Sequence, residues 1–176
     1  MTGSGHGVSI RVDHVGIAVR SVADAEPVLA ALGCEKLSDE AVTEDGSVPY
    51  ETVGDDARFR WAYYELGDAS RLELIEPLAG GGFIEEFLDR NGPGLHHVTL
   101  EVADLDSVAD HLQAAGLDVV DRRAYDTWTE AFVSPRNPTG ALFQLMEYHD
   151  GYAATADRLP PDELFVNGHP VGEADR

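Results

Sequence analysis

Hydrophobic and polar positions along this chain follow one pattern twice. A valine-rich run over 8–19 predicts a β-strand, and apolar residues spaced three and four apart then predict a helix that ends at Gly33. The same order recurs with a strand over 95–102 and a helix that Asp104 begins and Gly116 ends. Three further strands are expected after each helix. The pattern therefore predicts an α+β protein of two pseudo-symmetric βαβββ modules.

The remaining elements follow from shorter signals. The later strands are expected near Glu51, over 59–66, 71–75, 118–121, 131–134 and 141–148. Between the modules, FIEEFL predicts a short amphipathic helix that Asn91 and Gly92 end. The last residues show no clear periodicity. We therefore expect a first module over 8–77, a linker helix within 78–93, a second module over 94–149 and a C-terminal extension over 150–176.

The two modules are also related residue by residue. The segment His14–Gly33 aligns without a gap with His97–Gly116, so histidine falls on histidine and glycine on glycine. A second match, LELIEP against FQLMEY, places Glu73 opposite Gln144. A duplicated unit tends to give two-fold pseudo-symmetry, in which matched polar residues face one shared centre. The repeat therefore predicts that two imidazoles, one carboxylate and one amide meet.

Successive side chains of a β-strand point to opposite faces of the sheet, and this alternation, or strand parity, indicates the same residues independently. The large branched side chains of the first strand share one face, which we expect to pack on the helix, so His14 lies on the opposite face beside small residues. In the matching strand, parity places His97 on the open face and His96 on the helix side. Glu73 and Gln144 likewise alternate with apolar residues that face the helices.

This set of groups is typical of a metal site. Neutral imidazoles with one carboxylate and one amide oxygen suit a divalent ion such as Co, Zn, Ni, Mn or Fe. A single carboxylate leaves a net positive centre, which can polarise a carbonyl oxygen and stabilise an enolate. A lone inward histidine is more often a satisfied core residue, but a symmetric pair favours coordination. The predicted ligands are His14, Glu73, His97 and Gln144.

Composition limits the partners of the protein. The formal net charge is −21, and the acidic residues are spread along the chain. Such a chain repels phosphate backbones and anionic lipid surfaces, so we expect neither nucleic acid nor membrane as a partner. Lys36 is the single lysine among 12 lysines and arginines. Dispersed carboxylates with almost no lysine are typical of halophilic proteins.

The cellular compartment is predicted from three features that the sequence lacks: a membrane span, a signal peptide and a pair of cysteines. No apolar run approaches the roughly 18 residues that a membrane span needs, and the polar start MTGSGHG does not resemble a signal peptide. Cys34 is the only cysteine, so an internal disulfide is excluded, and we interpret it as a small turn residue. We therefore expect a cytoplasmic protein.

Four segments together carry a resemblance to a known family. They are VDHVGIAV, LELIEPL, FIEEFLDRNGPGLHHVTLEV and FVSPRNPTGALFQL. They resemble the vicinal oxygen chelate superfamily, which includes glyoxalases and extradiol dioxygenases, and within it the methylmalonyl-CoA epimerases. The resemblance covers Val12 to Tyr148, and the linker helix followed by GPGLHHVTLEV is its most specific part. It implies paired βαβββ modules that form curled mixed sheets around a metal-binding cavity, and a homodimer.

The resemblance also implies residue roles. Epimerases of this family bind the metal through two His, one Gln and one Glu, which carry over onto the four ligands predicted above. In the family the Gln comes from the first module and the Glu from the last strand, and here they are exchanged. The family's first-module base falls near Trp61, where no inward carboxylate is obvious. Glu130 on the matching strand is a candidate substitute, although in a chain this acidic the composition favours the alternative, an exposed carboxylate at a strand edge.

Several functions are compatible with this set of residues. The resemblance implies a metal-dependent epimerase of a 2-methyl-branched acyl-CoA such as methylmalonyl-CoA, in which Glu73 and Glu130 serve as catalytic groups. A glyoxalase-type lyase uses the same ligand types. An extradiol-type dioxygenase would hold iron with His14, His97 and Glu73. A non-catalytic ligand-binding module is the last alternative.

Overall fold

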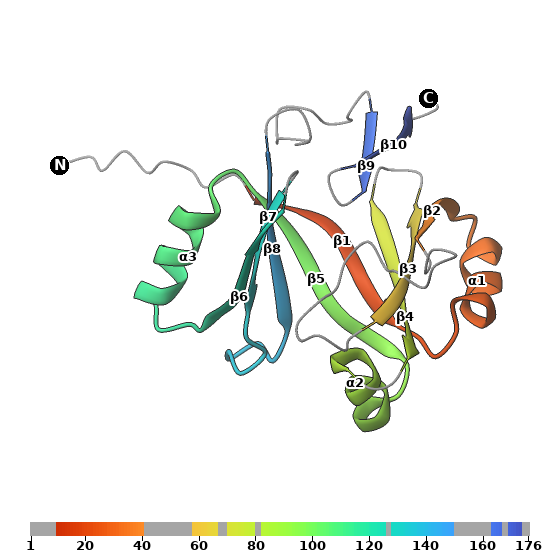
Figure 1. Ribbon diagram of the computed structural model, residues 1–176, viewed down its shortest axis with the longest axis horizontal. Coiled ribbons are helices and arrows are strands. Elements are labelled where there is room, and N and C mark those ends of the chain that lie inside the picture. The colour runs from red at the N-terminus through yellow and green to blue at the C-terminus, as the bar shows by residue number, and fades with distance from the viewer. Residues whose placement is uncertain are drawn as a thin grey trace. The chain divides into compact units, whose positions relative to one another are not determined.

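A computed structural model of the chain contains the predicted βαβββ order twice (Figure 1). It describes residues 10–40, 58–66, 70–79, 82–125, 128–149, 163–166 and 169–173. The first set of elements is β1 (Ile10–Ala18), α1 (Val22–Ala31), β2 (Glu35–Glu40), β3 (Arg58–Glu65) and β4 (Arg71–Ala79). The connecting helix is α2 (Phe83–Asn91). The later elements are β5 (Gly94–Val102), α3 (Leu105–Ala114), β6 (Val119–Ala124), β7 (Trp128–Val133), β8 (Leu142–Tyr148), β9 (Glu163–Val166) and β10 (His169–Glu173).

Eight of the strands form one mixed sheet, in the order β2-β3-β4-β1-β5-β8-β7-β6. The strands β1 and β4 run parallel, whereas consecutive strands within each β-meander run antiparallel. Because β2 and β6 end the order, the sheet is not closed into a barrel. The α+β class and the mixed sheet are therefore confirmed. The residue boundaries of the modules stay a prediction.

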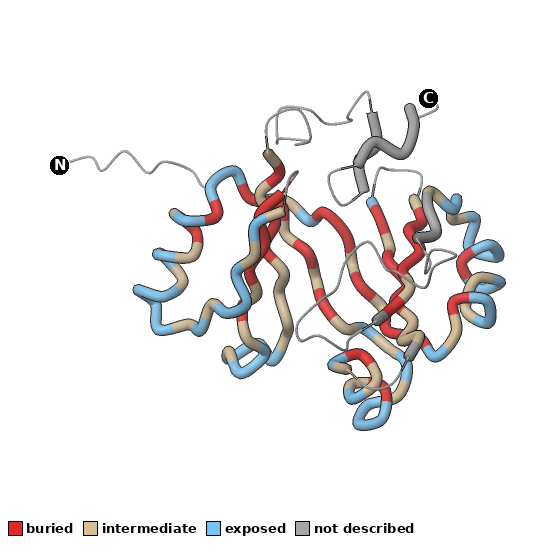
Figure 2. Tube along the Cα trace, in the orientation of Figure 1, coloured by how far each residue is buried: buried red, intermediate tan, exposed pale blue. Residues whose placement is uncertain are grey.

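The chain divides into two compact units, one of residues 13–98 and one of residues 1–12 with 99–176. In the first unit, α1 lies beside β3 and β4 (Figure 1). Buried residues of the helix and these strands form one core. Figure 2 colours the buried parts of the trace red in α1, β3 and β4. Its buried members are Val19, Val22, Leu29, Ala62, Tyr64 and Leu74. Leu74 therefore faces the helix, as strand parity predicts.

The second unit repeats this arrangement with α3 against β6, β7 and β8. Its buried core consists of Val102, Leu105, Val108, Ala131, Val133 and Leu145. Leu100 and Phe143 pack against the same cluster, so the faces predicted for β5 and β8 are confirmed. Burying these apolar faces is the main stabilising contribution of each helix, at about 25 cal/mol per Å² of apolar surface removed from water.

Both helices begin with a side-chain cap. The Ser21 hydroxyl accepts a hydrogen bond from the Asp24 backbone N–H, and the Asp104 carboxylate accepts one from the Ser107 backbone N–H. These bonds satisfy N–H groups that a helix leaves without partners in its first turn. The predicted cap at Asp104 is therefore confirmed.

A second capping contact comes from the closing strand of each module. The Glu76 carboxylate on β4 accepts from the Val22 backbone N–H at 2.8 Å. The Glu147 carboxylate on β8 accepts from the Leu105 backbone N–H at 2.7 Å. A negative charge at a helix N-terminus is also stabilised by the helix dipole. The repeat therefore extends to the contacts that join helix and sheet.

Each helix ends where the sequence predicts. Gly33 and Gly116 have φ values of 83° and 82°, in the left-handed region that glycine adopts without strain. Leu32, the apolar residue just before Gly33, is 71% exposed. The reason is that Leu32 is the C-cap residue, beyond the last helical turn.

Several strands differ from the prediction. The edge strand β2 was missed because EKLSDE is polar and pairs with β3 through an irregularity between Lys36 and Ser38. The strand β6 extends past Asp121, which has a φ of 51° at a bulge that breaks the alternation. The strands β9 and β10 pair antiparallel in a segment without periodicity. The strand expected near Glu51 lies outside the described residues.

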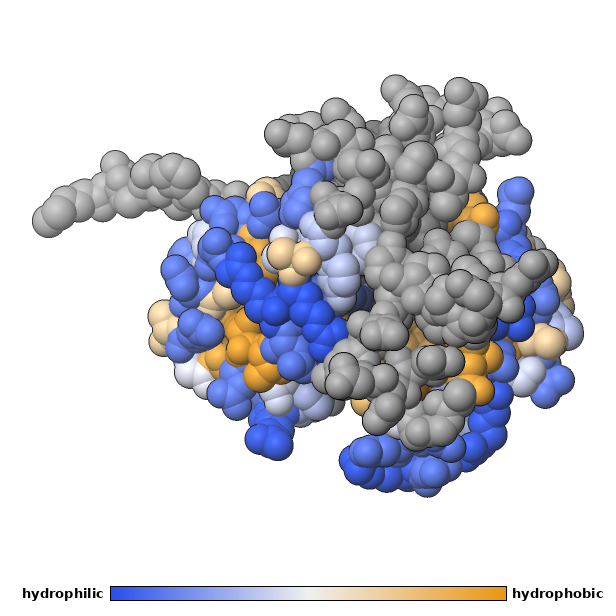
Figure 3. All heavy atoms as spheres, in the orientation of Figure 1, coloured by the Kyte–Doolittle hydropathy of each residue, from blue (hydrophilic) through white to orange (hydrophobic). Residues whose placement is uncertain are grey.

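Polar side chains occupy much of the visible described surface (Figure 3). This is consistent with the net charge of −21. Among the described residues, none of the helices combines the length and the apolar character that crossing a bilayer requires.

Candidate metal centre

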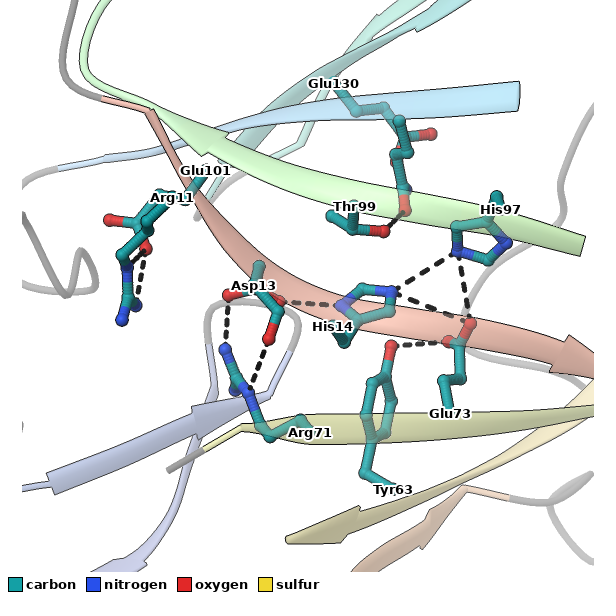
Figure 4. A network of polar contacts seen from close by, with 11 residues as sticks. Arg11, Asp13, His14, Tyr63, Arg71, Glu73, His97, Thr99, Glu101 and Glu130 are labelled. Atoms are coloured by element: carbon teal, nitrogen blue, oxygen red, sulfur yellow. Dashed lines mark hydrogen bonds and ion pairs between the residues drawn. The ribbon is translucent and has the colours of Figure 1, made fainter. Parts of the chain in front are cut away.

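Two imidazoles and one carboxylate converge within the unit of residues 13–98 (Figure 4). His14 on β1 and His97 on β5 place their Nε2 atoms 3.4 Å apart. One carboxylate oxygen of Glu73 on β4, Oε2, lies 3.7 Å from His14 Nε2 and 3.5 Å from His97 Nε2. All three residues are buried, with exposed fractions of 1%, 6% and 7% for His14, Glu73 and His97. Three of the four predicted ligands are therefore brought together.

The strands position these groups through register and one glycine. In the parallel pair of β1 and β4, Gly16 lies opposite Glu73. A β-carbon at Gly16 would lie 2.1 Å from Cε1 of His97, far inside van der Waals contact. The absence of a side chain at Gly16 therefore makes the space that the His97 imidazole fills. The expectation that small residues flank His14 on this face is confirmed at this position.

The three ligand atoms fit a divalent cation. Metal–nitrogen bonds of about 2.1 Å in tetrahedral geometry separate neighbouring ligand atoms by about 3.4 Å. The separations of 3.4, 3.5 and 3.7 Å lie close to this value. The three ligand atoms also lie within 4.8 Å of one another, and all three residues are buried. Two imidazoles and one carboxylate are donors that Zn, Fe, Co, Ni and Mn accept.

The far nitrogen of each imidazole also has a partner. His14 Nδ1 lies 2.7 Å from a carboxylate oxygen of Asp13, and His97 Nδ1 lies 3.0 Å from Nδ1 of His96. Metal-binding histidines almost always donate the N–H of the nitrogen that does not bind the ion. Both Nε2 atoms therefore face the centre while both Nδ1 atoms are held from behind.

The far oxygen of Glu73 is held in the same way. The Tyr63 hydroxyl donates to Glu73 Oε1 at 2.5 Å, and the two residues are cross-strand partners on β3 and β4. Tyr63 is almost fully buried, and its ring meets the His14 ring edge-on. With Oε1 engaged by Tyr63, the oxygen that faces the imidazoles is Oε2.

The electrostatics favour neutral imidazoles at His96 and His97. Burial, reinforced by the neighbouring His14 and His96, holds the pKa of His97 well below its usual value of 6.5. Burial lowers the pKa of His96 to about 4. His96 packs against the Phe83 and Phe87 rings of α2, which accounts for much of that burial. A histidine must be unprotonated to bind a metal, so His97 has the required state near neutral pH.

A second polar cluster lies in the other compact unit. The Thr99 hydroxyl donates to Gln144 Oε1 at 2.6 Å, and Gln144 Nε2 donates to Glu130 Oε2 at 2.8 Å. The Tyr125 hydroxyl donates to the other oxygen of Glu130 at 3.1 Å. Gln144 belongs to this cluster, and its role as a fourth ligand stays a prediction.

Glu130 is not the exposed edge carboxylate that was the alternative interpretation. It is 5% exposed on β7. Burial raises its pKa above the ordinary value of 4.5, and the hydrogen bonds from Gln144 and Tyr125 lower it in part. A raised pKa makes the protonated form of a carboxyl group easier to populate, which favours a role in acid–base catalysis.

Sequence reasoning missed the residues behind the ligands. Asp13 directly precedes the predicted ligand His14, but no role was predicted for it, although the adjacent pair Asp13-His14 is visible in the sequence. Tyr63 lies in FRWAYY, where no polar alternation marks an inward position. His96 was assigned to the helix side, but its ring also reaches His97. No role was predicted for Arg71, whose guanidinium donates a hydrogen bond to Asp13.

With this geometry in place, comparison with known proteins defines the class. The family model described as the Glyoxalase/Bleomycin resistance protein/Dioxygenase superfamily matches residues 13–132. The chain therefore belongs to this superfamily, and the resemblance drawn from its four segments is confirmed.

Particular members of the superfamily are similar to this chain over most of its length. The uncharacterised protein YqjC of Bacillus subtilis strain 168 is 32% identical over 141 residues, which are 78% of this chain and 91% of YqjC. The methylmalonyl-CoA epimerase of Mycobacterium tuberculosis is 30% identical, with a TM-score of 0.62 over 77% of this chain and 86% of that one. A Streptomyces coelicolor methylmalonyl-CoA epimerase variant, solved with 2-nitronate-propionyl-CoA, is 28% identical, with a TM-score of 0.62 over 79% and 97%.

Proposed function

We propose that this protein is a metal-dependent epimerase of a 2-methyl-branched acyl-CoA, such as methylmalonyl-CoA. The observation that carries the proposal is the convergence of His14 Nε2, His97 Nε2 and Glu73 Oε2 in a buried site. The similar epimerase structures support the choice of reaction, and one of them contains an acyl-CoA analogue. Gln144 is the proposed fourth ligand. Co, Zn, Ni, Mn and Fe are the candidate ions.

The chemistry of this reaction matches the groups in the site. Epimerisation removes the proton α to the thioester and returns it on the opposite face. When bound, a divalent cation supplies positive charge that stabilises the enolate oxygen. The chain must then provide acid–base groups, and Glu73 and Glu130 are the proposed ones. A buried carboxyl such as Glu130, with its raised pKa, is suited to exchanging a proton with a weak carbon acid.

Strand register supports the assignment of Glu130. On β3 and β4, Trp61 is the partner of Ile75, two residues beyond Glu73. On β7 and β8, Glu130 is the partner of Met146, two residues beyond Gln144. Trp61 and Glu130 therefore occupy matched positions in the two modules. The carboxylate that the family resemblance leads us to expect at Trp61 is proposed to be supplied by the second module.

Solvent exchange tests this function. The protein, loaded with Co(II) or Zn(II), is incubated with (R,S)-methylmalonyl-CoA in deuterated water, and deuterium at C2 is followed by mass spectrometry. We expect exchange that depends on the metal and is lost in His97→Ala. The absence of enzyme-dependent deuterium at C2 with every candidate metal would contradict the proposal.

One observation favours a second candidate function. Two imidazoles and one carboxylate are also the ligands of non-haem Fe(II) oxygenases, which leave positions open for oxygen. The cluster of His14, His97 and Glu73 has this composition. An extradiol-type dioxygenase would consume oxygen when Fe(II)-loaded protein meets a catechol. Oxygen uptake without deuterium exchange at C2 of the acyl-CoA would favour this function over epimerisation.

We further propose a cytoplasmic homodimer. The support for the dimer is the resemblance to the epimerase family. Light scattering coupled to gel filtration tests the assembly, with a mass of about twice the 19.0 kDa chain as the expected result. A single-chain mass at micromolar concentration would contradict it.

A further inference from the structure

We propose that Asp13, anchored by Arg71, is the positioning residue of His14. It holds the imidazole as the tautomer with hydrogen on Nδ1, so that the free lone pair of Nε2 points to the metal centre. The inference rests on the proposed metal site. It adds a role for a buried ion pair that the ligand set does not include.

The geometry forms a chain of contacts from β4 to the centre (Figure 4). The Arg71 guanidinium donates to Asp13 Oδ2, and its Nε lies 3.4 Å from the Asp13 backbone oxygen. The other oxygen, Asp13 Oδ1, lies 2.7 Å from His14 Nδ1. The side chains of Asp13 and Arg71 are only 1% and 7% exposed. Each oxygen of Asp13 therefore has its own partner, one cationic and one the imidazole.

Stability alone is a weak reason for this pair. Removing two charges from water costs several kcal/mol per ion, and apolar side chains of similar volume often serve the fold equally well. A buried Asp–Arg pair between β1 and β4 therefore points to another requirement. Its position, directly behind a proposed ligand, identifies that requirement as control of His14.

The choice of tautomer decides whether His14 can bind a cation. A carboxylate accepts hydrogen bonds and offers no hydrogen, so an imidazole nitrogen facing it carries the hydrogen. Nε2 of His14 then keeps a lone pair, 3.7 Å from Glu73 Oε2 and 3.4 Å from His97 Nε2. In the other tautomer, an N–H would point into the centre and two lone pairs would face each other at 2.7 Å. Asp13 selects against that state.

The matched position of the second module has a different chemistry. His96 aligns with Asp13 in the repeat and contacts His97 Nδ1 at 3.0 Å. Its imidazole is held in place by the aromatic rings of α2 rather than by an arginine. A carboxylate behind a metal-binding histidine raises its basicity as a ligand, so control by charge is specific to His14.

The test replaces Asp13 by Asn and measures metal affinity together with tautomer. Because Arg71 needs an acceptor, the amide oxygen should turn to Arg71 and its NH₂ should face His14 Nδ1, which favours hydrogen on Nε2. We expect Asp13→Asn to weaken Co(II) binding about 10- to 100-fold, the usual cost of losing such a partner. Co(II) affinity is measured by competition with a chelator. The tautomer is measured by long-range ¹H–¹⁵N NMR of the metal-free protein.

Two double variants make the result independent of folding. In Asp13→Asn with Arg71→Met, the amide can turn its oxygen to His14, so the Nδ1–H tautomer and most of the affinity should return. The second double variant, Asp13→Leu with Arg71→Met, replaces the ion pair by apolar side chains and keeps the buried volume. It should lose both the Nδ1–H tautomer and the Co(II) affinity. The matched control is Glu101→Gln, a buried carboxylate paired with Arg11 at 2.5 Å. It should leave tautomer and affinity unchanged.

The outcomes separate this inference from the proposed function. Failure of the unaltered protein to bind Co(II) would overturn the proposed metal site. Binding that is tight in the unaltered protein and equally tight in Asp13→Asn and Asp13→Leu/Arg71→Met, with the His14 tautomer unchanged, would overturn the role of Asp13 alone.

Discussion

The two modules have the same framework but carry different polar groups. Both helices are capped from the closing strand of their own module, by Glu76 and by Glu147, and both end at a left-handed glycine. Both first strands carry an inward histidine, His14 and His97. The repeat thus includes the contact that joins each helix to the closing strand of its own module.

The residues around the histidines have diverged. The first module has the carboxylate Glu73 with the Tyr63 hydroxyl behind it, whereas the second has the amide Gln144 with the Glu130 carboxylate behind it. In the first pair the acidic group is Glu73 on the closing strand β4. In the second pair the acidic group is Glu130 on the neighbouring strand β7. The comparison indicates that both modules use the same arrangement of strands and helix. They differ in the polar side chains at matched positions, which give each module different chemical groups.

The largest expected effect on metal binding concerns the inward histidine that both modules share. His14→Ala and His97→Ala should each weaken Co(II) binding by about 100-fold or more, beyond the usual cost of losing a residue that only contacts a ligand. Chelator competition measures both. His111→Ala on the exposed face of α3 is the control and should change nothing. A large loss in only one of the two variants would contradict equal roles for the matched histidines.

The next effect tests what the second module alone supplies. Glu130→Gln should lower the rate of deuterium exchange at C2 by about 10²- to 10⁴-fold, the usual contribution of an acid–base group. Metal affinity should stay within a few-fold of the unaltered protein, since Gln144 remains in place. Turnover and chelator competition are measured on the same preparation. Full activity in this variant would remove Glu130 from the reaction.

A smaller effect tests the first module. Tyr63→Phe removes the hydroxyl that holds Glu73 Oε1 and should weaken metal binding about 10-fold, at the low end for such a partner. Tyr64→Phe is the matched control, because its ring belongs to the core under α1, on the other face of β3. Equal losses in the two variants, measured by cobalt titration, would assign the effect to packing rather than to Glu73.

The smallest effect tests the common framework. Glu76→Ala and Glu147→Ala each remove a carboxylate that accepts from a helix N-terminus, and each should lower the free energy of unfolding by about 1 kcal/mol. Urea titration of the metal-free protein measures both. Costs that differ by more than about 1 kcal/mol would show that the two caps are not equivalent, because loss of a cap typically costs about that amount.

The parts of this account that could be predicted are those governed by repetition and parity. The alignment of His14 with His97 selected two strands, and the alternation of large and small side chains selected the inward face of each. The repeat and the alternation can both be read from the sequence without knowing which distant residues meet. The structure brings His14, Glu73 and His97 together as they indicate. Asp104, Gly33 and Gly116 marked the helix ends for the same reason.

The parts that could not be predicted depend on partners distant in the chain. Tyr63 acquires its role from pairing with Glu73 across the β3–β4 ladder, and FRWAYY gives no alternation that would mark its face. Asp13 matters because Arg71, 58 positions further along the chain, balances its charge. The strand β2 is mostly polar and ends the order of the sheet among the described residues, so no hydrophobic periodicity revealed it.

The most direct test of the central claim is a crystal structure of the protein grown with Co(II), with anomalous diffraction recorded at the cobalt edge. We predict one strong peak bonded to Nε2 of His14, Nε2 of His97 and an oxygen of Glu73. A peak bound elsewhere, or a fully occupied cobalt that leaves either imidazole uncoordinated, would contradict the account.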